Sequence, residues 1–333
     1  MVKSSGSLAN KKKALIGFPI LLGLLILLAG GQTVGIDEKK LSDFNAASLG
    51  GMLFNDVLLS KDFSVSCASC HKPEFAFADT VAFSVGINGQ VGSRNTPSAM
   101  NVLARTALFW DGRASSLEEH ALQPIANPKE MGLSIVEAID RLRRHPVYPD
   151  LFERVYGKEP DSNLLANALA EFQRTLETTN TAWDRYAIYG EDIDPAVIRG
   201  KAIFDSEGMC LECHFTPDFT ADEFFNIGIF NGEEFNDRGR FKVSGDSTDL
   251  GKFKVPGLRN VAITAPYMHN GMFKTLEEVL EFYNDTRSVV PNSINQDERL
   301  REPLGLSREE MQDVIAFLNA LTDDRFVHLL GSR

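Results

Sequence analysis

The chain has 333 residues, of which 43% are hydrophobic, and a formal net charge of −12 at pH 7. A chain of this length can bury more than one core, and its negative charge argues against nucleic acid as a partner. Residues 1–31 contain four lysines and no acidic residue, so the rest of the chain would carry a charge of −16.

The beginning of the chain has the pattern of an export signal. Three lysines at 11–13 precede an almost uncharged apolar run at 14–29, which is the order of a charged and an apolar region in a signal peptide. Small residues follow the run and offer a cleavage site, but the run is also long enough to stay as a membrane tether at 14–31. We predict that residues 1–31 are a signal peptide or an N-terminal membrane anchor.

All four cysteines belong to two copies of the pentapeptide C-x-x-C-H, at 67–71 and 210–214. Two thiols three positions apart can form thioethers to the vinyl groups of one haem, and the adjacent histidine can bind the iron. Disulfides or a four-cysteine zinc site would use the same cysteines, but neither explains the histidine after each pair. The sequence predicts two covalently bound haem c groups, held by Cys67, Cys70, His71, Cys210, Cys213 and His214.

Helical patterns recur in both halves of the chain. Short apolar segments at 51–54 and 200–204 precede the two motifs, and apolar residues at helical spacing close each half. The closing residues are Leu165, Leu169, Phe172 and Leu176 in the first half, and Met311, Val314, Ile315, Leu318 and Leu321 in the second.

Helix starts are marked by capping boxes, in which a Ser or Thr is followed three residues later by Glu. The pairs begin at Ser116, Thr275 and Ser307. An acidic, turn-forming segment at 190–195 separates the two halves. We predict an all-α protein with minor β structure, whose domains span residues 32–190 and 191–333.

The second axial position of each haem iron decides its chemistry. After His71, no other histidine occurs before His120 and no methionine before Met100. The loop at 84–89 therefore offers the first haem no strong ligand, which predicts an open and catalytic iron.

The second haem has more candidate ligands. They are Met268, His269, Met272, Tyr283, Met311 and His328. Tyr283 lies at helical spacing from Leu276, Val279 and Leu280, so it is predicted to point inward. Such a residue is either a core tyrosine or an iron ligand.

Four further segments identify a family resemblance. The segments are FWDGR at 109–113, NPKEM at 127–131, VPGLRN at 255–260 and APYMHNG at 265–271. With them, most of residues 45–322 resembles the bacterial di-haem cytochrome c peroxidase and MauG family. The resemblance implies two cytochrome c-like domains, each with one covalently attached haem, in the periplasm.

The resemblance also implies roles for single residues. Trp110 matches a tryptophan between the two haems, and an indole can be oxidised transiently to divide one long electron transfer into two shorter ones. Glu130 matches a glutamate that moves protons near the open iron. Three positions match oxygen ligands of a calcium ion, namely Asn95, Thr264 and Pro266.

Three residues depart from the ordinary family pattern. Ile87 stands where a histidine caps the first haem in members that need reductive activation, so we expect no activation step. Tyr283 replaces the methionine ligand of the second haem, as in MauG, and a hard anionic phenolate favours oxidised iron. His120 stands in place of a glutamine. It follows Leu117 by three positions on one expected helix, so it is predicted to point inward, either as a partner of Glu130 in proton transfer, as a residue that approaches the iron, or as a pocket residue interchangeable with glutamine.

The predicted function is reduction of hydrogen peroxide to water at the His71 haem. The oxidising equivalents would be shared with the His214 haem through Trp110. They would pass to a cytochrome c, a cupredoxin or, on the MauG model, a protein side chain converted into a cofactor. The alternative is a non-catalytic di-haem periplasmic electron-transfer protein. The sequence leaves open whether the protein forms a homodimer.

Overall fold

The computed structural model describes residues 26–27, 33–34 and 43–331. Strand β1 (Ile26–Leu27) pairs antiparallel with β2 (Thr33–Val34), within a unit that is separate from the compact unit of residues 45–333. The rest of the predicted export segment lies outside the described residues. Among those that are described, no helix is long and apolar enough to cross a membrane.

The part of the chain from residue 45 onward is mainly helical, as predicted. Its first helices are α2 (Ala46–Asn55), α3 (Cys67–Cys70), α4 (Leu117–Ala126), α5 (Ile135–Arg144), α6 (Tyr148–Tyr156) and α7 (Ser162–Arg174). Its later helices are α8 (Ala182–Tyr189), α9 (Pro195–Asp205), α10 (Phe241–Ser244), α11 (Leu276–Asn284), α12 (Thr286–Val289) and α13 (Arg308–Ala320). The only sheet described in this part is small and pairs β3 (Phe224–Phe225) antiparallel with β4 (Phe253–Lys254).

Short 3-10 helices connect these elements. They are η1 (Val57–Leu59), η2 (Pro73–Phe75), η3 (Ile87–Gly89), η4 (Cys210–Glu212), η5 (Ser247–Asp249), η6 (Val261–Ile263), η7 (Glu298–Leu300) and η8 (Val327–Leu329).

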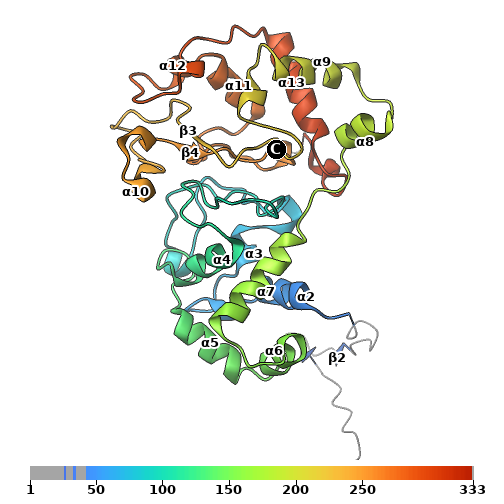
Figure 1. Cartoon of the computed structure of the whole chain (residues 1–333), viewed down its shortest axis with the longest axis vertical. Coiled ribbons are helices and arrows are strands. Elements are labelled where there is room, and N and C mark those ends of the chain that lie inside the picture. Colours follow the sequence, from blue (N-terminus) through green and yellow to red (C-terminus); the bar gives the residue numbers. More distant parts are fainter. Residues whose placement is uncertain (1–25, 28–32, 35–42, 332–333) are drawn as a thin grey trace, which may run out of the picture. The chain divides into compact units, whose positions relative to one another are not determined.

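The helices form two lobes. Helices α2 to α7 make the first lobe, and α8 to α13 with β3 and β4 make the second (Figure 1). In the first lobe α2 packs on α7, and in the second α9 packs on α13. Helix α8 precedes the predicted boundary at 190–195, yet it packs against α13, with the rings of Trp183 and Phe317 5.1 Å apart.

One glycine in each lobe permits the central helix crossing. A Cβ atom at Gly50 on α2 would overlap the backbone carbonyl of Ala168 on α7, and one at Gly200 on α9 would overlap that of Asp313 on α13. A backbone carbonyl cannot rotate away as a side chain can, so only glycine fits at these crossings. A glycine at the central helix crossing of each lobe supports the recurrence of one structural pattern in the two halves of the chain.

The closing helices bury their predicted apolar stripes. On α7, Leu165 is 0% and Leu169 is 1% exposed, and on α13 Val314 is 1% exposed. The core of the second lobe contains three rings in mutual edge contact, those of Phe204, Phe219 and Phe317.

Two of the three predicted capping boxes are complete. Thr275 and Ser307 each exchange hydrogen bonds with the glutamate three residues later, at the starts of α11 and α13. At α4 the prediction is half wrong: the Ser116 hydroxyl accepts from the Glu119 amide, but the Glu119 carboxylate accepts from the amide of Ser115 at 2.8 Å. The carboxylate binds one residue upstream because the Ser115 hydroxyl also donates to it.

The predicted single buried face of α11 is divided between two clusters. Leu276 and Leu280 enter the core shared with α9 and α13. Val279 and Tyr283 instead pack against a second cluster around Phe282. The two pairs diverge because positions three apart on a helix are rotated by about 60° from each other, so each pair can face a different neighbour.

Candidate functional site

The two Cys-x-x-Cys-His motifs fold in the same local way. The amide of His71 donates to the carbonyl oxygen of Cys67 at 2.9 Å, and the amide of His214 donates to that of Cys210 at 2.9 Å. Each motif is therefore one turn of helix that carries two thiols and ends in an imidazole. All four thiols are free in the structure.

The two histidine side chains are also held in the same way. Nδ1 of His71 lies 3.1 Å from the carbonyl oxygen of Phe77, and Nδ1 of His214 lies 2.9 Å from that of Phe219. A carbonyl can only accept, so Nδ1 carries the proton and Nε2 keeps its lone pair, as an axial haem ligand requires. Burial lowers the pKa of His71, and it lowers that of His214 to about 4, so both rings stay neutral. The motifs therefore fit haem attachment and iron ligation.

A cavity of about 570 Å³ lies beside the first motif. Its wall brings together predicted residues from distant parts of the chain, namely Cys67, Cys70, His71, Asn95, Trp110, His120 and Glu130. Residues of the second lobe, including Lys254 and Pro256, also line it, so the cavity reaches the junction between the lobes.

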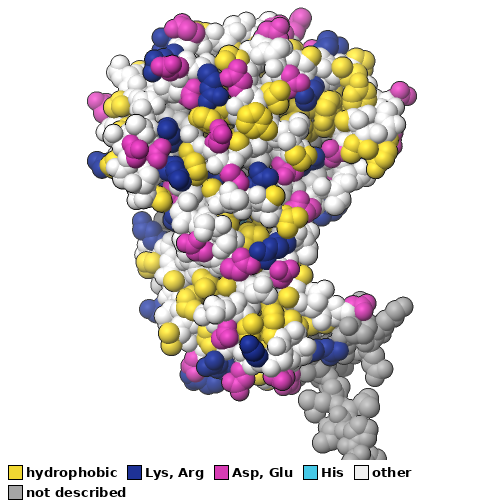
Figure 2. Space-filling model, viewed as in Figure 1, with side chains coloured by type: hydrophobic (Ala, Val, Ile, Leu, Met, Phe, Trp, Pro, Cys, Tyr) yellow, Lys and Arg dark blue, Asp and Glu magenta, His cyan; other side chains and the backbone are white. Residues whose placement is uncertain are grey.

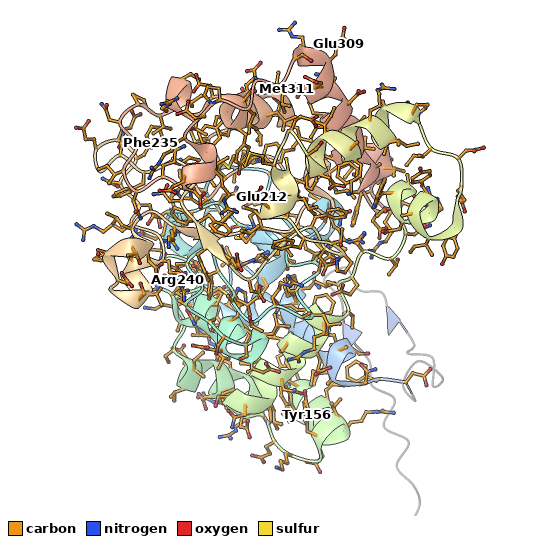
Figure 3. The ribbon with its side chains drawn as sticks, turned by 45° about the horizontal axis from the view of Figure 1, so that its top comes forward. Tyr156, Glu212, Phe235, Arg240, Glu309 and Met311 are labelled. Carbon is orange, nitrogen blue, oxygen red and sulfur yellow. The ribbon has the colours of Figure 1, made fainter. Side chains whose placement is uncertain are left out.

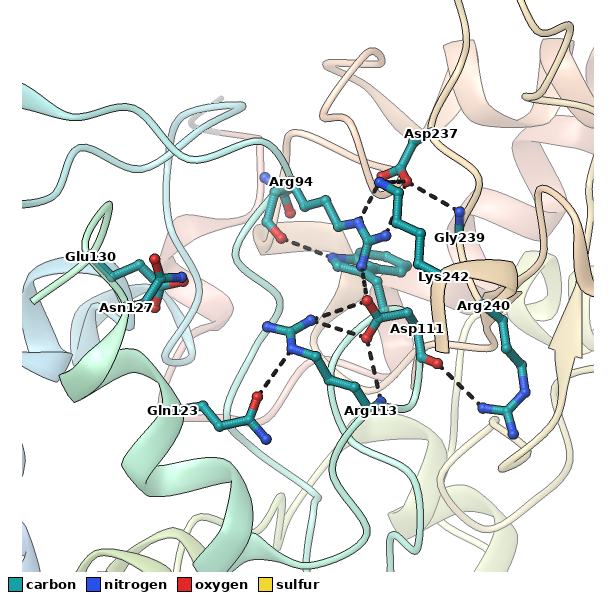
Figure 4. Close-up of polar contacts among 12 residues, drawn as sticks. Arg94, Asp111, Arg113, Gln123, Asn127, Glu130, Asp237, Gly239, Arg240 and Lys242 are labelled. Atoms are coloured by element: carbon teal, nitrogen blue, oxygen red, sulfur yellow. Dashed lines mark hydrogen bonds and ion pairs between the residues drawn. The ribbon is translucent and has the colours of Figure 1, made fainter. Parts of the chain in front are cut away.

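Glu130 lies in this cavity with one hydrogen bond and one nearby cation. The Asn127 side-chain amide donates to its Oε1 at 2.6 Å (Figure 4). Burial raises the pKa of Glu130, while Arg113 and the Asn127 bond oppose that rise. The carboxyl group can therefore hold a proton at a pH where an exposed glutamate has lost it.

His120 lines the same cavity, and burial reduces its affinity for a proton, whereas burial increases that of Glu130. Burial lowers the pKa of His120 to about 3, and the positive charge of Arg113 adds to the effect. Its Nδ1 is buried with no hydrogen-bond partner in the described chain. The ring lies 4.3 Å from that of Phe109, centroid to centroid. The prediction that His120 points inward from α4 is confirmed.

Arg113 is the cation that influences both Glu130 and His120. It was not among the site residues predicted from the sequence, although it belongs to the FWDGR segment. Its guanidinium lies 3.4 Å from the centroid of the Phe109 ring and donates to Asp111 and Gln123 (Figure 4). It acts electrostatically on both Glu130 and His120. Its position in a family motif is the feature of the sequence that could have identified it as a site residue.

Ile87 is buried away from the cavity wall. It is 3% exposed, its side chain lies against Gly132, and its amide donates to the carbonyl oxygen of Glu130 at 2.9 Å. The loop that contains it is thereby fixed to the segment that carries the acidic residue. From this loop, the side chain of Ser84 and the backbone of Gly86 line the cavity, and neither is a strong iron ligand.

Trp110 is bonded to both lobes. Its indole Nε1 donates to the carbonyl oxygen of Asn95 at 2.8 Å, and its own carbonyl accepts from the amide of Lys254 on β4 at 2.8 Å. Its ring lies 6.4 Å from that of His269, which stacks on Phe253 at 3.7 Å. The indole is thus fixed at the junction between the lobes.

The three predicted calcium positions lie on two segments that are bonded together. The amide of Asn95 donates to the carbonyl oxygen of His269 at 2.7 Å, and His269 follows Thr264 and Pro266 closely in sequence. The Asn95 side chain is 6% exposed, and its amide nitrogen donates to the carbonyl of Val81 at 3.2 Å. No hydrogen bond to its carboxamide oxygen is formed by the residues that the structure describes, and such an oxygen suits a hard cation.

Tyr283 lies in the second lobe near the second motif. Burial raises the pKa of its hydroxyl, and the neighbouring thiols of Cys213 and Cys210 raise it further. Met268 and Met272 pack against the same cluster as Tyr283. In the described chain, this tyrosine hydroxyl forms no hydrogen bond that would hold it away from a ligand.

The other candidate ligands are engaged elsewhere. Met311 on α13 packs into the core around Phe317, in the same lobe as Glu212 of the second motif (Figure 3). His269 is stacked on Phe253, and His328 is exposed on η8.

Comparison with known proteins decides the family. The profile of the di-haem cytochrome c peroxidase family matches residues 45–192. The methylamine utilization protein MauG of Methylorubrum extorquens is 38% identical, over 82% of this chain and 77% of that protein. The chain belongs to the di-haem cytochrome c peroxidase family. The cytochrome c551 peroxidase of Nitrosomonas europaea, 34% identical over 84% of this chain and 80% of its own, is another member.

Solved structures of di-haem peroxidases share the fold. A MauG-like protein associated with microbial copper homeostasis has a TM-score of 0.77 at 30% identity, covering 84% of this chain and 92% of that one. The diheme peroxidase BthA of Burkholderia thailandensis has a TM-score of 0.77 at 26% identity, covering 86% and 88%. The predicted fold, two cytochrome c-like domains, is confirmed. As a di-haem peroxidase family member, the chain is an oxidoreductase with two covalently bound haems.

Proposed function

We propose that this chain reduces hydrogen peroxide to water at a haem attached to Cys67 and Cys70 and ligated by His71. The observation that carries the proposal is the cavity beside His71, which gathers Glu130 and His120 and receives no strong ligand from the loop that holds Ile87. The overall reaction takes two protons and two electrons per peroxide and gives two waters. The haem supplies the redox chemistry, and the cavity residues handle the protons.

Glu130 and His120 divide the proton handling between them. Glu130 has the higher proton affinity of the two, so its carboxylate can accept a proton from peroxide and deliver it to the departing oxygen, and the neutral His120 can assist this transfer with its free lone pair. Burial keeps His120 neutral, Arg113 adds to this effect, and the charge of Arg113 can stabilise negative charge that develops in the cavity. The bond from Asn127 orients the Glu130 carboxyl group.

The second haem, attached to Cys210 and Cys213 and ligated by His214, would store oxidising equivalents. We assign Tyr283 as its second axial ligand, and the position of its hydroxyl near both thiols supports this assignment. Trp110 is the proposed relay between the haems, because its bonds to Asn95 and Lys254 fix its ring at the junction of the lobes.

Further parts of the proposal concern the surroundings of the haems. A calcium ion would bind through oxygen atoms of Asn95, Thr264 and Pro266 near Trp110.

The haem domains would span residues 32–190 and 191–333. Residues 1–31 would direct export to the periplasm, with cleavage or with a membrane tether.

The electron donor is an external protein. Relatives named as cytochrome c peroxidases and relatives named MauG are both similar to this chain, so a small cytochrome or cupredoxin and a protein substrate are the two donor classes. Tyr283 in place of a methionine favours the MauG-type branch. Asp and Glu side chains are interspersed with Lys and Arg on the face that Figure 2 shows, so docking depends on local charge patterns rather than on one uniform field.

Steady-state oxidation of reduced cytochrome c by peroxide tests the proposed activity. We expect peroxide-dependent turnover and a ferric spectrum with a high-spin component from the open haem. His120→Gln should slow the peroxide step if the imidazole accepts a proton, and an unchanged rate would reduce His120 to a pocket residue. Two low-spin haems without peroxide consumption would favour the di-haem electron-transfer protein instead.

A further inference from the structure

The cavity beside His71 is cationic although the chain as a whole is acidic. Seven lysine and arginine side chains line it, whereas Asp111 and Glu130 are its only carboxylates among the described residues. A buried excess of positive charge is costly unless anions compensate it. The lining therefore indicates that an anionic group occupies part of this cavity.

Several of these cations already have carboxylate partners. Arg94 binds Asp111 at 2.6 Å and Asp237 at 2.7 Å, and Arg259 binds Asp184 at 2.7 Å. The Arg94–Asp237 pair joins the two lobes, and all three pairs leave little charge for a ligand. The uncompensated charge belongs to other residues.

Lys254 is a buried ammonium group without a carboxylate partner. Its Nζ donates to the carbonyl oxygen of Val255 at 3.2 Å, and in the described chain no carboxylate oxygen lies within 4.0 Å of it. Burial lowers the pKa of Lys254 to about 8, Asp222 opposes this and Arg105 adds to it. An additional anion beside Nζ would restore the ordinary affinity of this amine for its proton.

Arg105 faces the same part of the cavity from the first lobe. Its Nη2 is 3.3 Å from Asp218, but its Nε is buried and has no hydrogen-bond partner in the described chain. The carboxylate of Asp222 does not fill this need: its Oδ2 accepts from the amide and hydroxyl of Thr106, and its buried Oδ1 forms no hydrogen bond within the described chain. Lys254 Nζ and Arg105 Nε thus line one cavity from different lobes, and among the described residues no carboxylate lies within hydrogen-bond distance of either atom.

We propose that Lys254 and Arg105 bind the propionate carboxylates of a haem at the junction of the two lobes. A carboxylate satisfies both donors through charge-assisted hydrogen bonds, and the cavity that they line also contains the cysteines and the histidine of the first motif. The assignment rests on the haem placement in the proposed function and is independent of the reaction with peroxide. Both residues are positioning residues.

The charge of Lys254 should act on haem potential as well as on position. A nearby cation stabilises the ferrous state, which carries one more electron, so its removal favours ferric haem. We expect Lys254→Met to lower the ratio of ferrous to ferric haem about tenfold at a fixed potential, which equals about 59 mV for one electron. Lys254→Arg keeps the charge and should restore most of that ratio.

Spectroelectrochemical titration of the two-haem protein, without peroxide, measures both potentials. The thioethers keep the haems attached in every variant, and Arg105→Gln provides a second test with the same expected direction. Lys242→Met is the matched control, because Lys242 lines the same cavity but already binds Asp237 at 2.7 Å and is half exposed. It should leave both potentials unchanged.

Two results would overturn this assignment. Both potentials could stay the same in Lys254→Met and in Arg105→Gln, which would mean that neither cation acts on a haem. Alternatively, the haem potential of Lys254→Arg could be as low as that of Lys254→Met, which would show that the charge of Lys254 does not set the potential. An inactive peroxidase with the predicted shifts in potential would contradict only the proposed reaction.

Discussion

Glu130 and His120 face one cavity, and their surroundings move their proton affinities in opposite directions. Burial makes the carboxyl group easier to protonate and the imidazole harder to protonate. The carboxylate is therefore the better proton acceptor of the two, and the imidazole stays neutral beside it. A proton released by peroxide goes to Glu130, and His120 is left as a neutral partner with a free lone pair.

Glu130→Gln should slow the reaction with peroxide by about 100-fold or more, because the amide keeps the shape but cannot transfer a proton. In the wild type, the rate should fall as the pH drops through the raised pKa of Glu130, so this acid limb lies above pH 4.5, the ordinary value. Stopped-flow mixing over a range of pH measures both effects. A Glu130→Gln variant that keeps the acid limb would assign that limb to another group.

Tyr283→Met should raise the reduction potential of the second haem, because a soft thioether favours ferrous iron and a phenolate favours ferric iron. Axial ligands span about 0.8 V, so a rise of more than about 0.1 V is expected. Tyr283→Phe provides a control that removes the hydroxyl without adding a ligand. If the potential of this haem is the same in Tyr283→Met and in the wild type, Tyr283 is not its ligand.

At the level of elements, each lobe depends on a helix pair that crosses at a glycine. Gly50 lies against the Ala168 carbonyl, whereas its neighbour Gly51 would place a Cβ only 3.2 Å from the Phe172 ring. A ring can shift by a few tenths of an ångström, but a helix backbone cannot do so without separating α2 from α7. The two adjacent positions therefore differ in what they tolerate.

Gly50→Ala should lower the free energy of unfolding by about 2–3 kcal/mol, because the new methyl group overpacks the crossing. Gly51→Ala is the matched control on the same helix, where the better helix propensity of alanine, up to about 1 kcal/mol, offsets its contact with Phe172. Denaturant unfolding of both variants tests the crossing. Equal losses for the two variants would contradict it.

The sequence predicts local features of these elements better than distant contacts. The motifs at 67–71 and 210–214, the stripes of α7 and α13 and the inward position of His120 follow from spacing over a few residues. The divided face of α11 could not be predicted, because it depends on two separate clusters, formed by residues distant in sequence, that pack against neighbouring parts of one helix face. The packing of α8 against α13 likewise depends on a contact between Trp183 and Phe317, which are distant in sequence.

At the level of the whole molecule, buried ion pairs connect the lobes. Arg94 of the first lobe binds Asp237 of the second through two bonds of 2.7 and 3.0 Å, and it also binds Asp111 (Figure 4). The Arg94 and Lys242 bonds hold the pKa of Asp237 well below its usual range, despite its burial. No local pattern in the sequence could have paired residues 94 and 237, because the two segments meet only in the folded chain.

Asp237→Asn should destabilise the protein by about 2 kcal/mol at neutral pH, because it leaves Arg94 partly unpaired at the lobe junction. Since folding lowers the pKa of Asp237, the stabilisation is present above its unfolded pKa and is lost as the pH falls toward its folded pKa. Asp313→Asn is the matched control, because Arg199 binds Asp313 bidentately but is 59% exposed, and solvent screens such a surface pair so that it contributes little stability. Thermal unfolding at several pH values compares the variants, and equal losses would contradict a special role of the junction.

We propose that the His71 haem is open without prior reduction, because Ile87 is buried against Gly132 and cannot act as a ligand. The decisive measurement is to mix the fully oxidised protein with one equivalent of peroxide and to record its spectrum in time. We predict an immediate reaction that oxidises both haems, together with the same rate after partial reduction. A fully oxidised protein that does not react until one haem has been reduced would show that the His71 haem is closed in the oxidised state.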